Sequence, residues 1–232
     1  INVYYGKIHA LKDVSLEVKE GEIVGILGTS GSGKTTLLRI LRGVEKFDEG
    51  EVRVERYTLK PDSTQFYFNQ VKKETAIHLQ RSFGIWPETV LDNVVRKLYG
   101  AKYGDEAGTD FELAHDQFDK EAYELLELVG LKEKSGHLAS VLSGGEKVRC
   151  MFAKLMLEAP NILVLEDPTN HLDLESITAL NEGMINYKGN ILFSSHDAEL
   201  LQTVANRIIS FNKDGSYTDR MTDYESFLEL NN

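Results

Sequence analysis

The chain has 232 residues, of which 41% are hydrophobic, and a formal net charge of −11 at pH 7. This length can bury one sizeable core with a subdomain folded against it. The acidic balance argues against broad electrostatic adhesion to nucleic acid or to an anionic membrane. No apolar stretch is long enough to span a bilayer and no secretion signal opens the chain, so we expect a cytoplasmic protein without an intrinsic membrane span. Because Ile1 comes first, we expect a part of a longer chain.

Short runs rich in Val, Ile and Leu alternate with amphipathic segments of helical period. This alternation predicts an α/β fold with a parallel-sheet core. The expected central strands, buried on both faces, span 22–27, 161–165, 190–195 and 207–211. Over about residues 50–80, the alternation in GEVRVERYTL and the aromatic FYF at 66–68 predict a small antiparallel β lobe.

A helical subdomain is predicted at about residues 88–157, inserted into this core. Two amphipathic stretches, 88–100 and 119–131, are expected to flank a polar loop at 102–115. The closing segment, SYTDRMTDYESFLELNN, predicts a final turn and a short helix. We therefore expect residues 1–232 to form one domain with lobes.

The segment GTSGSGKTT at 28–36 fits the pattern G-x-x-x-x-G-K-[ST] and lies between a predicted strand and a predicted helix, as a phosphate-binding loop requires. Its glycines let successive N–H groups point inward at phosphate oxygens, and the following helix adds its positive N-terminal end. The lysine would lie against the β- and γ-phosphates and the next hydroxyl would ligate Mg²⁺. The predicted contacts are Gly28, Ser30, Gly31, Ser32, Gly33, Lys34, Thr35 and Thr36.

A second candidate anion site is VLSGGEKVRC at 141–150. Ser143, Gly144 and Gly145 at a helix start would point backbone N–H groups at an anion. Taken alone, S-G-G-E is better interpreted as a capped helix start. Between an upstream phosphate loop and the downstream LEDPTNHLD, however, LSGGE resembles the signature of the ABC ATPase family. The resemblance covers essentially the whole chain and implies that Ser143 to Glu146 reach the γ-phosphate of ATP held by an opposite subunit, in a head-to-tail dimer.

The same resemblance assigns four further positions. Tyr5 stands where the family stacks an aromatic ring on adenine, with Tyr4 as its rival. Gln80, in HLQRSFG, resembles the glutamine that contacts Mg²⁺ and the attacking water. Asp173 ends the NHLD loop, which pairs across the dimer. His196, in LFSSHD, resembles the histidine that hydrogen-bonds the γ-phosphate.

Two adjacent carboxylates precede the proline of LEDPTNHLD, in an order opposite to that of the family. The resemblance implies that Glu166 takes the metal position, with Thr35 and Gln80, and that Asp167 takes the position of the residue that polarises the attacking water. One methylene, about 1.5 Å of reach, is thus added at the metal and removed at the water. We expect tight Mg-ATP binding and slow hydrolysis. The alternative is that backbone adjustment or a bridging water absorbs the exchange.

Subfamily resemblance differs along the chain. From LSGGE onward the sequence is similar to the ABC-F branch, whose members carry two fused ATPase domains and often act on ribosomes. Residues 1 to about 140 are more similar to the ATPase component that activates methyl-coenzyme M reductase, or to an importer-type subunit. With one phosphate loop, the chain would act as a homodimer or with a second ABC domain. The expected client is a ribosome or a protein complex, or alternatively a membrane permease, and the mixed halves also admit an engineered ATPase without a cellular partner.

Overall fold

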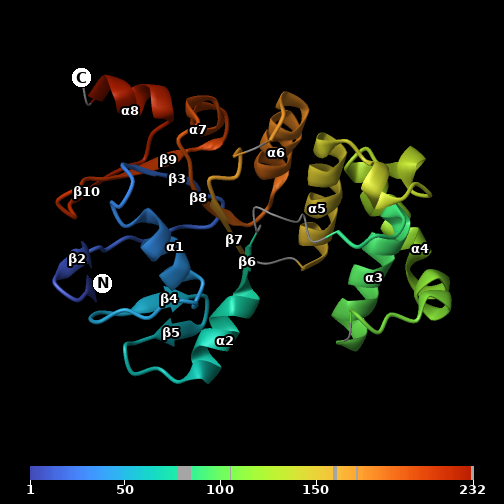
Figure 1. The fold of residues 1–232 in the computed structure, drawn as a ribbon, viewed down its shortest axis with the longest axis horizontal. Coiled ribbons are helices and arrows are strands. Elements are labelled where there is room, and N and C mark those ends of the chain that lie inside the picture. The colour runs from blue at the N-terminus through green and yellow to red at the C-terminus, as the bar shows by residue number, and fades with distance from the viewer. Residues whose placement is uncertain (78–84, 105, 159–160, 171, 231–232) are drawn as a thin grey trace. The chain divides into compact units, whose positions relative to one another are not determined.

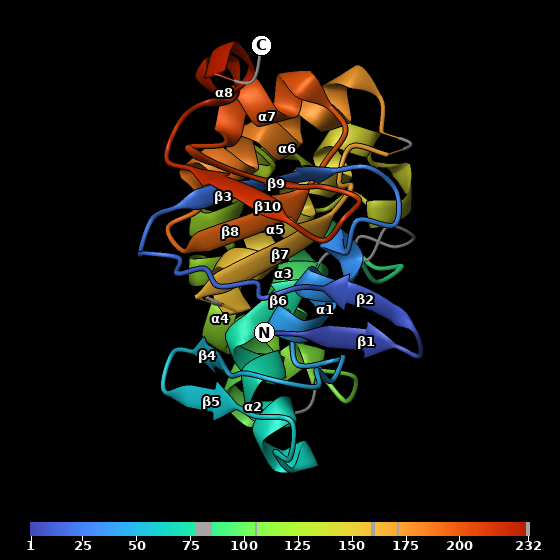
Figure 2. The same cartoon turned by 90° about the vertical axis from the view of Figure 1, so that its left-hand side faces the viewer.

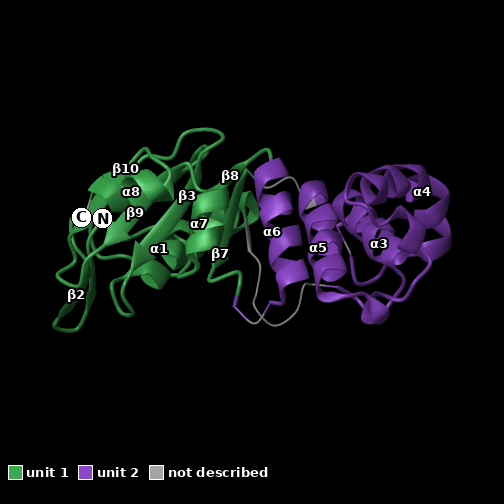
Figure 3. Ribbon diagram, turned by 90° about the horizontal axis from the view of Figure 1, so that it is seen from above, with its two compact units in different colours: residues 1–78, 160–169, 188–232 green, residues 79–159, 170–187 purple. Residues whose placement is uncertain are grey.

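The computed structural model describes residues 1–77, 85–104, 106–158, 161–170 and 172–230. The chain divides into two compact units, coloured separately in Figure 3. Unit 1 comprises residues 1–78, 160–169 and 188–232, and unit 2 comprises 79–159 and 170–187. The helical unit thus includes, besides the stretch predicted at 88–157, the segment 170–187, which begins within LEDPTNHLD.

Unit 1 is built on a six-stranded sheet in the order β10-β9-β3-β8-β7-β6, and Figure 2 shows its strands one above another. Neighbouring strands are parallel except for the antiparallel pair β9 and β10. The four strands predicted at the centre are present as β3, β7, β8 and β9. The strands are β3 (Ile23–Gly28), β6 (Thr75–Ile77), β7 (Ile162–Glu166), β8 (Asn190–Ser194), β9 (Arg207–Phe211) and β10 (Tyr217–Arg220).

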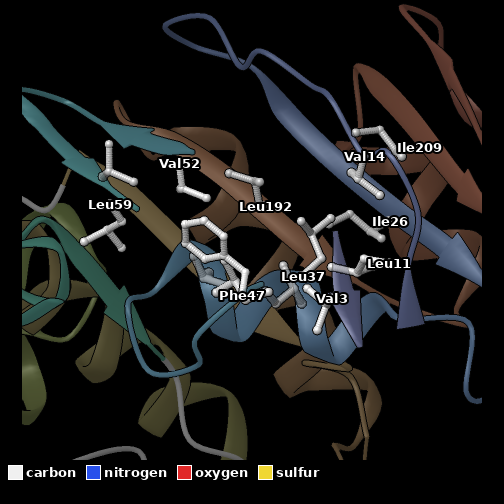
Figure 4. Packing of buried hydrophobic residues seen from close by; sticks show 14 of the residues in the cluster. Val3, Leu11, Val14, Ile26, Leu37, Phe47, Val52, Leu59, Leu192 and Ile209 are labelled. Atoms are coloured by element: carbon white, nitrogen blue, oxygen red, sulfur yellow. The ribbon is translucent and has the colours of Figure 1, made fainter. Parts of the chain in front are cut away.

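Among the described residues, two hairpins and four helices complete unit 1, as can be followed in Figure 1. The hairpins pair β1 (Val3–Tyr5) with β2 (Ile8–Leu11) and β4 (Val52–Val54) with β5 (Tyr57–Leu59). The helices are α1 (Lys34–Leu41), α2 (Gln65–Glu74), α7 (Ala198–Val204) and α8 (Tyr224–Leu230). Leu37 of α1 packs into one apolar cluster with Ile26 of β3 and Phe47 (Figure 4). This packing fixes the start of α1 at the end of β3.

Two expectations for unit 1 are wrong. The aromatic FYF lies in α2 and not in a strand, because only Phe68 of the three is buried, beside Val71 one helical turn later. The antiparallel lobe is therefore limited to the β4–β5 hairpin. In the closing segment, residues 217–220 form β10 before the predicted short helix, since they pair with β9.

Unit 2 is helical. Its α-helices are α3 (Val90–Tyr103), α4 (Phe111–Leu128), α5 (Gly144–Glu158) and α6 (Leu174–Asn186), with 3₁₀ turns η1 (Lys132–Lys134) and η2 (Ala139–Val141). The loop predicted at 102–115 is shorter, because the Asp110 side chain accepts from the N–H of Leu113 and starts α4 there. Within the described ranges, no helix is both long and apolar enough to cross a membrane.

His115 joins α4 to α3 in unit 2. Its Nδ1 lies 2.6 Å from Asp119 of α4, and its Nε2 lies 3.0 Å from Asp92 of α3. Burial alone would lower the pKa of this imidazole. The hydrogen bonds and charges of the two aspartates outweigh it, so the pKa of His115 is raised above its ordinary value.

Candidate phosphate-binding site

The loop between β3 and α1 needs glycine at both of its ends. Gly28 has φ 145° and Gly33 has φ 100°, a region that other residues rarely adopt. Neither position has room for a side chain. A Cβ on Gly28 would lie 2.7 Å from the Phe211 carbonyl oxygen, and a Cβ on Gly33 would lie 2.7 Å from the Ala10 carbonyl oxygen. The loop is therefore held against β9 on one side and β2 on the other.

The side chains of this loop fall into an exposed tip and a buried base. Ser30 and Gly31 are exposed at the tip, whereas Ser32 is buried and its hydroxyl has no hydrogen-bond partner among the described residues. Lys34 is only 8% exposed, and its ammonium donates to the carbonyl oxygens of Gly28 at 2.6 Å and Thr29 at 3.1 Å. The loop thus gathers a buried cation and an unpaired hydroxyl beside the start of α1, the groups that bind phosphate oxygens.

The two carboxylates lie at the same edge of the sheet as the loop. Glu166 ends β7, and its Oε1 accepts a short hydrogen bond from the Thr35 hydroxyl. The next residue, Asp167, has φ 41°, and its N–H donates to the carbonyl oxygen of Ser194 at 2.9 Å. The structure therefore brings together two of the three predicted metal ligands, Thr35 in the first turn of α1 and Glu166 at the carboxyl end of β7. Gln80, the third, lies outside the described residues.

His196 also follows this edge. It is exposed and comes two residues after β8, where Asp197 caps α7 by accepting from the N–H groups of Glu199 and Leu200. The cap stops the strand and starts a helix directly after His196, which fixes the backbone on both sides of the imidazole. Thr36, in the first turn of α1, is half-buried.

The two tyrosine candidates, neighbours in β1, have different surroundings. Tyr4 stacks on His9, with ring centroids 4.2 Å apart and the planes inclined by 20°. Tyr5 is 46% exposed, and its hydroxyl donates to Glu45. One face of Tyr4 is thus occupied, while Tyr5 points to the opposite side of its strand. Tyr5 is the better stacking platform.

Arg42, at the end of α1, is a charged residue that the sequence did not single out. Burial lowers the pKa of its guanidinium, the nearby Arg39 lowers it further, and the negative charge of Glu166 opposes both. Its Nε is buried without a hydrogen-bond partner among the described residues. Nothing in its sequence context marks it, since an arginine at a helix end is ordinary.

In unit 2, the start of α5 is capped in the way the simpler interpretation of S-G-G-E predicts. The Glu146 N–H donates to the Ser143 hydroxyl at 3.3 Å, and the Ser143 N–H donates to the Glu146 carboxylate at 2.9 Å. Lys134 donates to the same carboxylate. This lysine, the N–H of Ser143 and its hydroxyl hold the pKa of Glu146 below its ordinary value, against a smaller opposing effect of burial.

The start of α6 packs directly on the start of α5. Asp173 caps α6 by accepting from the Ser176 N–H at 2.8 Å and from its hydroxyl at 2.5 Å. A Cβ on Gly144 would overlap the Ser176 hydroxyl, and one on Gly145 would lie 2.8 Å from Glu175 Cγ. The two signature glycines are therefore required by close packing. The sequence did not show that Asp173 would cap α6, nor that α6 would meet the signature.

Comparison with known proteins shows the family of this chain. The family described as ABC transporter matches residues 11–170. An uncharacterised ABC transporter ATP-binding protein of Methanocaldococcus jannaschii is 37% identical over 213 residues, which are 88% of this chain and 37% of the relative. ABC transporter F family member 2 of Arabidopsis thaliana is 35% identical over 218 residues, which are 94% of this chain and 28% of the relative. The chain thus spans about a third of the length of these curated relatives.

Among solved structures, a similar chain is an ATP-binding cassette whose structure is described as a dimeric post-hydrolysis state bound to ADP and Pi. It is 28% identical, with a TM-score of 0.63 and 94% of each chain covered.

Proposed function

This chain belongs to the ABC transporter family of ATP-binding proteins, and from that premise we propose that it binds Mg-ATP between two copies, hydrolyses it slowly, and uses the closure of the dimer to do mechanical work on a partner. The observation that carries this proposal is the meeting of the phosphate loop with the carboxylate pair at one edge of the sheet in unit 1.

Nucleotide binding follows from the chemistry of the loop. The buried ammonium of Lys34 and the backbone N–H groups at the start of α1 favour the β- and γ-phosphates, and the exposed ring of Tyr5 gives adenine a face to stack on. The Tyr5–Glu45 hydrogen bond orients that ring.

The donors at the edge of the sheet fit Mg²⁺. Thr35 and Glu166 present a hydroxyl and a carboxylate already in contact, and hard oxygen ligands completed by phosphate oxygens and water suit this ion. When bound there, the ion neutralises charge that develops on the phosphates. Asp167 would orient the attacking water and accept its proton, and His196 would donate to the γ-phosphate.

Slow hydrolysis follows from the carboxylate order. Asp167 is one methylene shorter than the glutamate that the family places there, so its oxygens stop about 1.5 Å earlier. General-base work needs heavy atoms within about 2.6–3.2 Å, and a misplacement of about 1 Å can reduce the rate about a hundredfold. Since the charge at both positions is unchanged, nucleotide affinity should survive.

Dimerisation is supported by the signature. The phosphate loop belongs to unit 1 and the start of α5 to unit 2, and a similar cassette is described as dimeric. Beside the signature, Leu174 is 75% exposed and Val141 is 66% exposed. Apolar side chains at such exposure, next to an anion-binding helix start, suit a surface that a second copy covers.

Two classes of function differ in the partner on which the closing dimer acts. A soluble remodelling factor of ABC-F or reductase-activating type would act on a ribosome or a protein complex, and the 35% identity to an F family member favours it. A transporter subunit would act on a membrane permease, and the 37% identity to a transporter ATP-binding protein favours that. Affinity capture with ATP-trapped protein discriminates them: ribosomes or reductase support the first, and a permease supports the second.

Calorimetric titration tests nucleotide binding. Lys34→Ala removes the one fixed cation of the loop and should abolish measurable ATP affinity. An unchanged affinity would reject the assignment of the loop.

A further inference from the structure

We propose that Glu175 is an internal competitor for the partner copy's phosphate. In this structure its side chain lies against the signature nest, which we define as Ser143, Gly144 and Gly145 at the start of α5. The inference rests on the proposed function, because it concerns the surface that the second copy's nucleotide would meet.

One oxygen of Glu175 contacts groups that favour an anion. Its Oε1 accepts from the Ser143 hydroxyl at 3.1 Å and lies 3.8 Å from a guanidinium nitrogen of Arg149. It also lies 3.0 Å from the position that a Cβ on Gly145 would take. A hydroxyl, a guanidinium and the positive end of a helix therefore converge on this carboxylate, and each of them favours an anion.

Two other carboxylates reach the same place but are committed to holding helix ends. Glu146 closes the capping box of α5 and binds Lys134. Asp173 caps α6 through the N–H and hydroxyl of Ser176, and these hydrogen bonds hold the pKa of Asp173 below its ordinary value. Removing either one would damage the helix start itself, so neither is suited to leave when a ligand arrives.

Glu175 can leave. Its side chain is 53% exposed, and it contacts the nest through one hydroxyl and a distant guanidinium. Such exposed contacts exchange with water at little energetic expense. A γ-phosphate arriving from a second copy would meet this negative charge first, so closure of the dimer requires the carboxylate to swing out of each nest.

Glu175→Gln tests this role, because the amide oxygen still accepts from the Ser143 hydroxyl while the charge is lost. The dimerisation constant would be measured by sedimentation velocity with Mg²⁺ and adenylyl imidodiphosphate, a hydrolysis-resistant analogue. Glu175→Gln removes the repulsion between this carboxylate and the incoming phosphate at both α5 starts of the dimer. This predicts about three- to thirtyfold tighter association than the parent. Glu182→Gln is the matched control: it removes the same charge from the exposed face of α6 and should leave association unchanged.

The outcomes separate this inference from the proposed function. If the parent dimerises only with the analogue, and Lys34→Ala does not dimerise, the proposed function stands. Glu175→Gln must then associate more tightly than both parent and control. Association equal to the control, or weaker than the parent, overturns the competitor role alone. A parent that stays monomeric refutes the proposed function and this inference with it.

Discussion

Exchanging the two carboxylates, Glu166→Asp with Asp167→Glu, should make ATP hydrolysis faster. In the structure the Glu166 carboxylate accepts a hydrogen bond from the Thr35 hydroxyl, and Asp167 follows in the chain with φ 41°. The exchange moves about 1.5 Å of reach from the metal position to the water position. Since a misplacement of about 1 Å can change a rate up to about a hundredfold, we expect a gain of about ten- to a hundredfold, or about 1.4–2.7 kcal/mol of barrier.

Steady-state phosphate release at saturating ATP measures this gain, with affinity checked by calorimetry. The Asp167→Glu variant alone should carry most of the increase, because it restores reach toward the water, while Glu166→Asp alone should not. A glutamate at position 167 also fits the positive φ less well than aspartate does, so the free energy of unfolding of Asp167→Glu should fall by about 1 kcal/mol. Equal rates for parent and double variant, with unchanged affinity, would refute the reasoning about order.

Three further predictions concern adenine stacking, the His115 contacts and the packing of α6. Tyr5→Ala should weaken ATP binding by about 1–3 kcal/mol through lost stacking, whereas Tyr4→Ala should leave it nearly unchanged; calorimetry decides. His115 has a raised pKa, so its stabilisation is present below about pH 6.5 and is lost as pH rises through the folded-state pKa; the loss of unfolding free energy in His115→Gln should be larger at pH 5.5 than at pH 8.5 by urea titration. Gly183→Ala should destabilise by about 1–3 kcal/mol in the same titration, because its Cβ would lie 2.7 Å from Phe152 Cγ.

The elements that the sequence predicted well are those whose signals are local. The strand–loop–helix at 23–41 carries its own glycines, and the apolar runs of β7, β8 and β9 are too continuous for a surface position. The aromatic run in α2 misled the prediction, because aromatic residues favour strands only on a half-buried surface, and two of these three rings are exposed.

The site shows the same division. The Thr35–Glu166 contact could be anticipated, since both residues stand at the carboxyl edge of predicted parallel strands. The contact of Glu175 with Ser143 could not, because it joins residues 32 positions apart across two helix starts. Sequence spacing gives no sign of how those helices pack. The steric need for Gly145 likewise appears only once α6 is in place.

The central claim is that two copies close on Mg-ATP through the signature. Light scattering after size exclusion, with ATP and Mg²⁺ present, tests it most directly on the parent and on Ser143→Arg, provided that calorimetry shows the variant still binds ATP. We expect a dimer for the parent and a monomer for the variant, because the arginine fills the signature nest and removes the hydroxyl at the start of α5. If the variant dimerises as well as the parent, the two copies do not close through the signature.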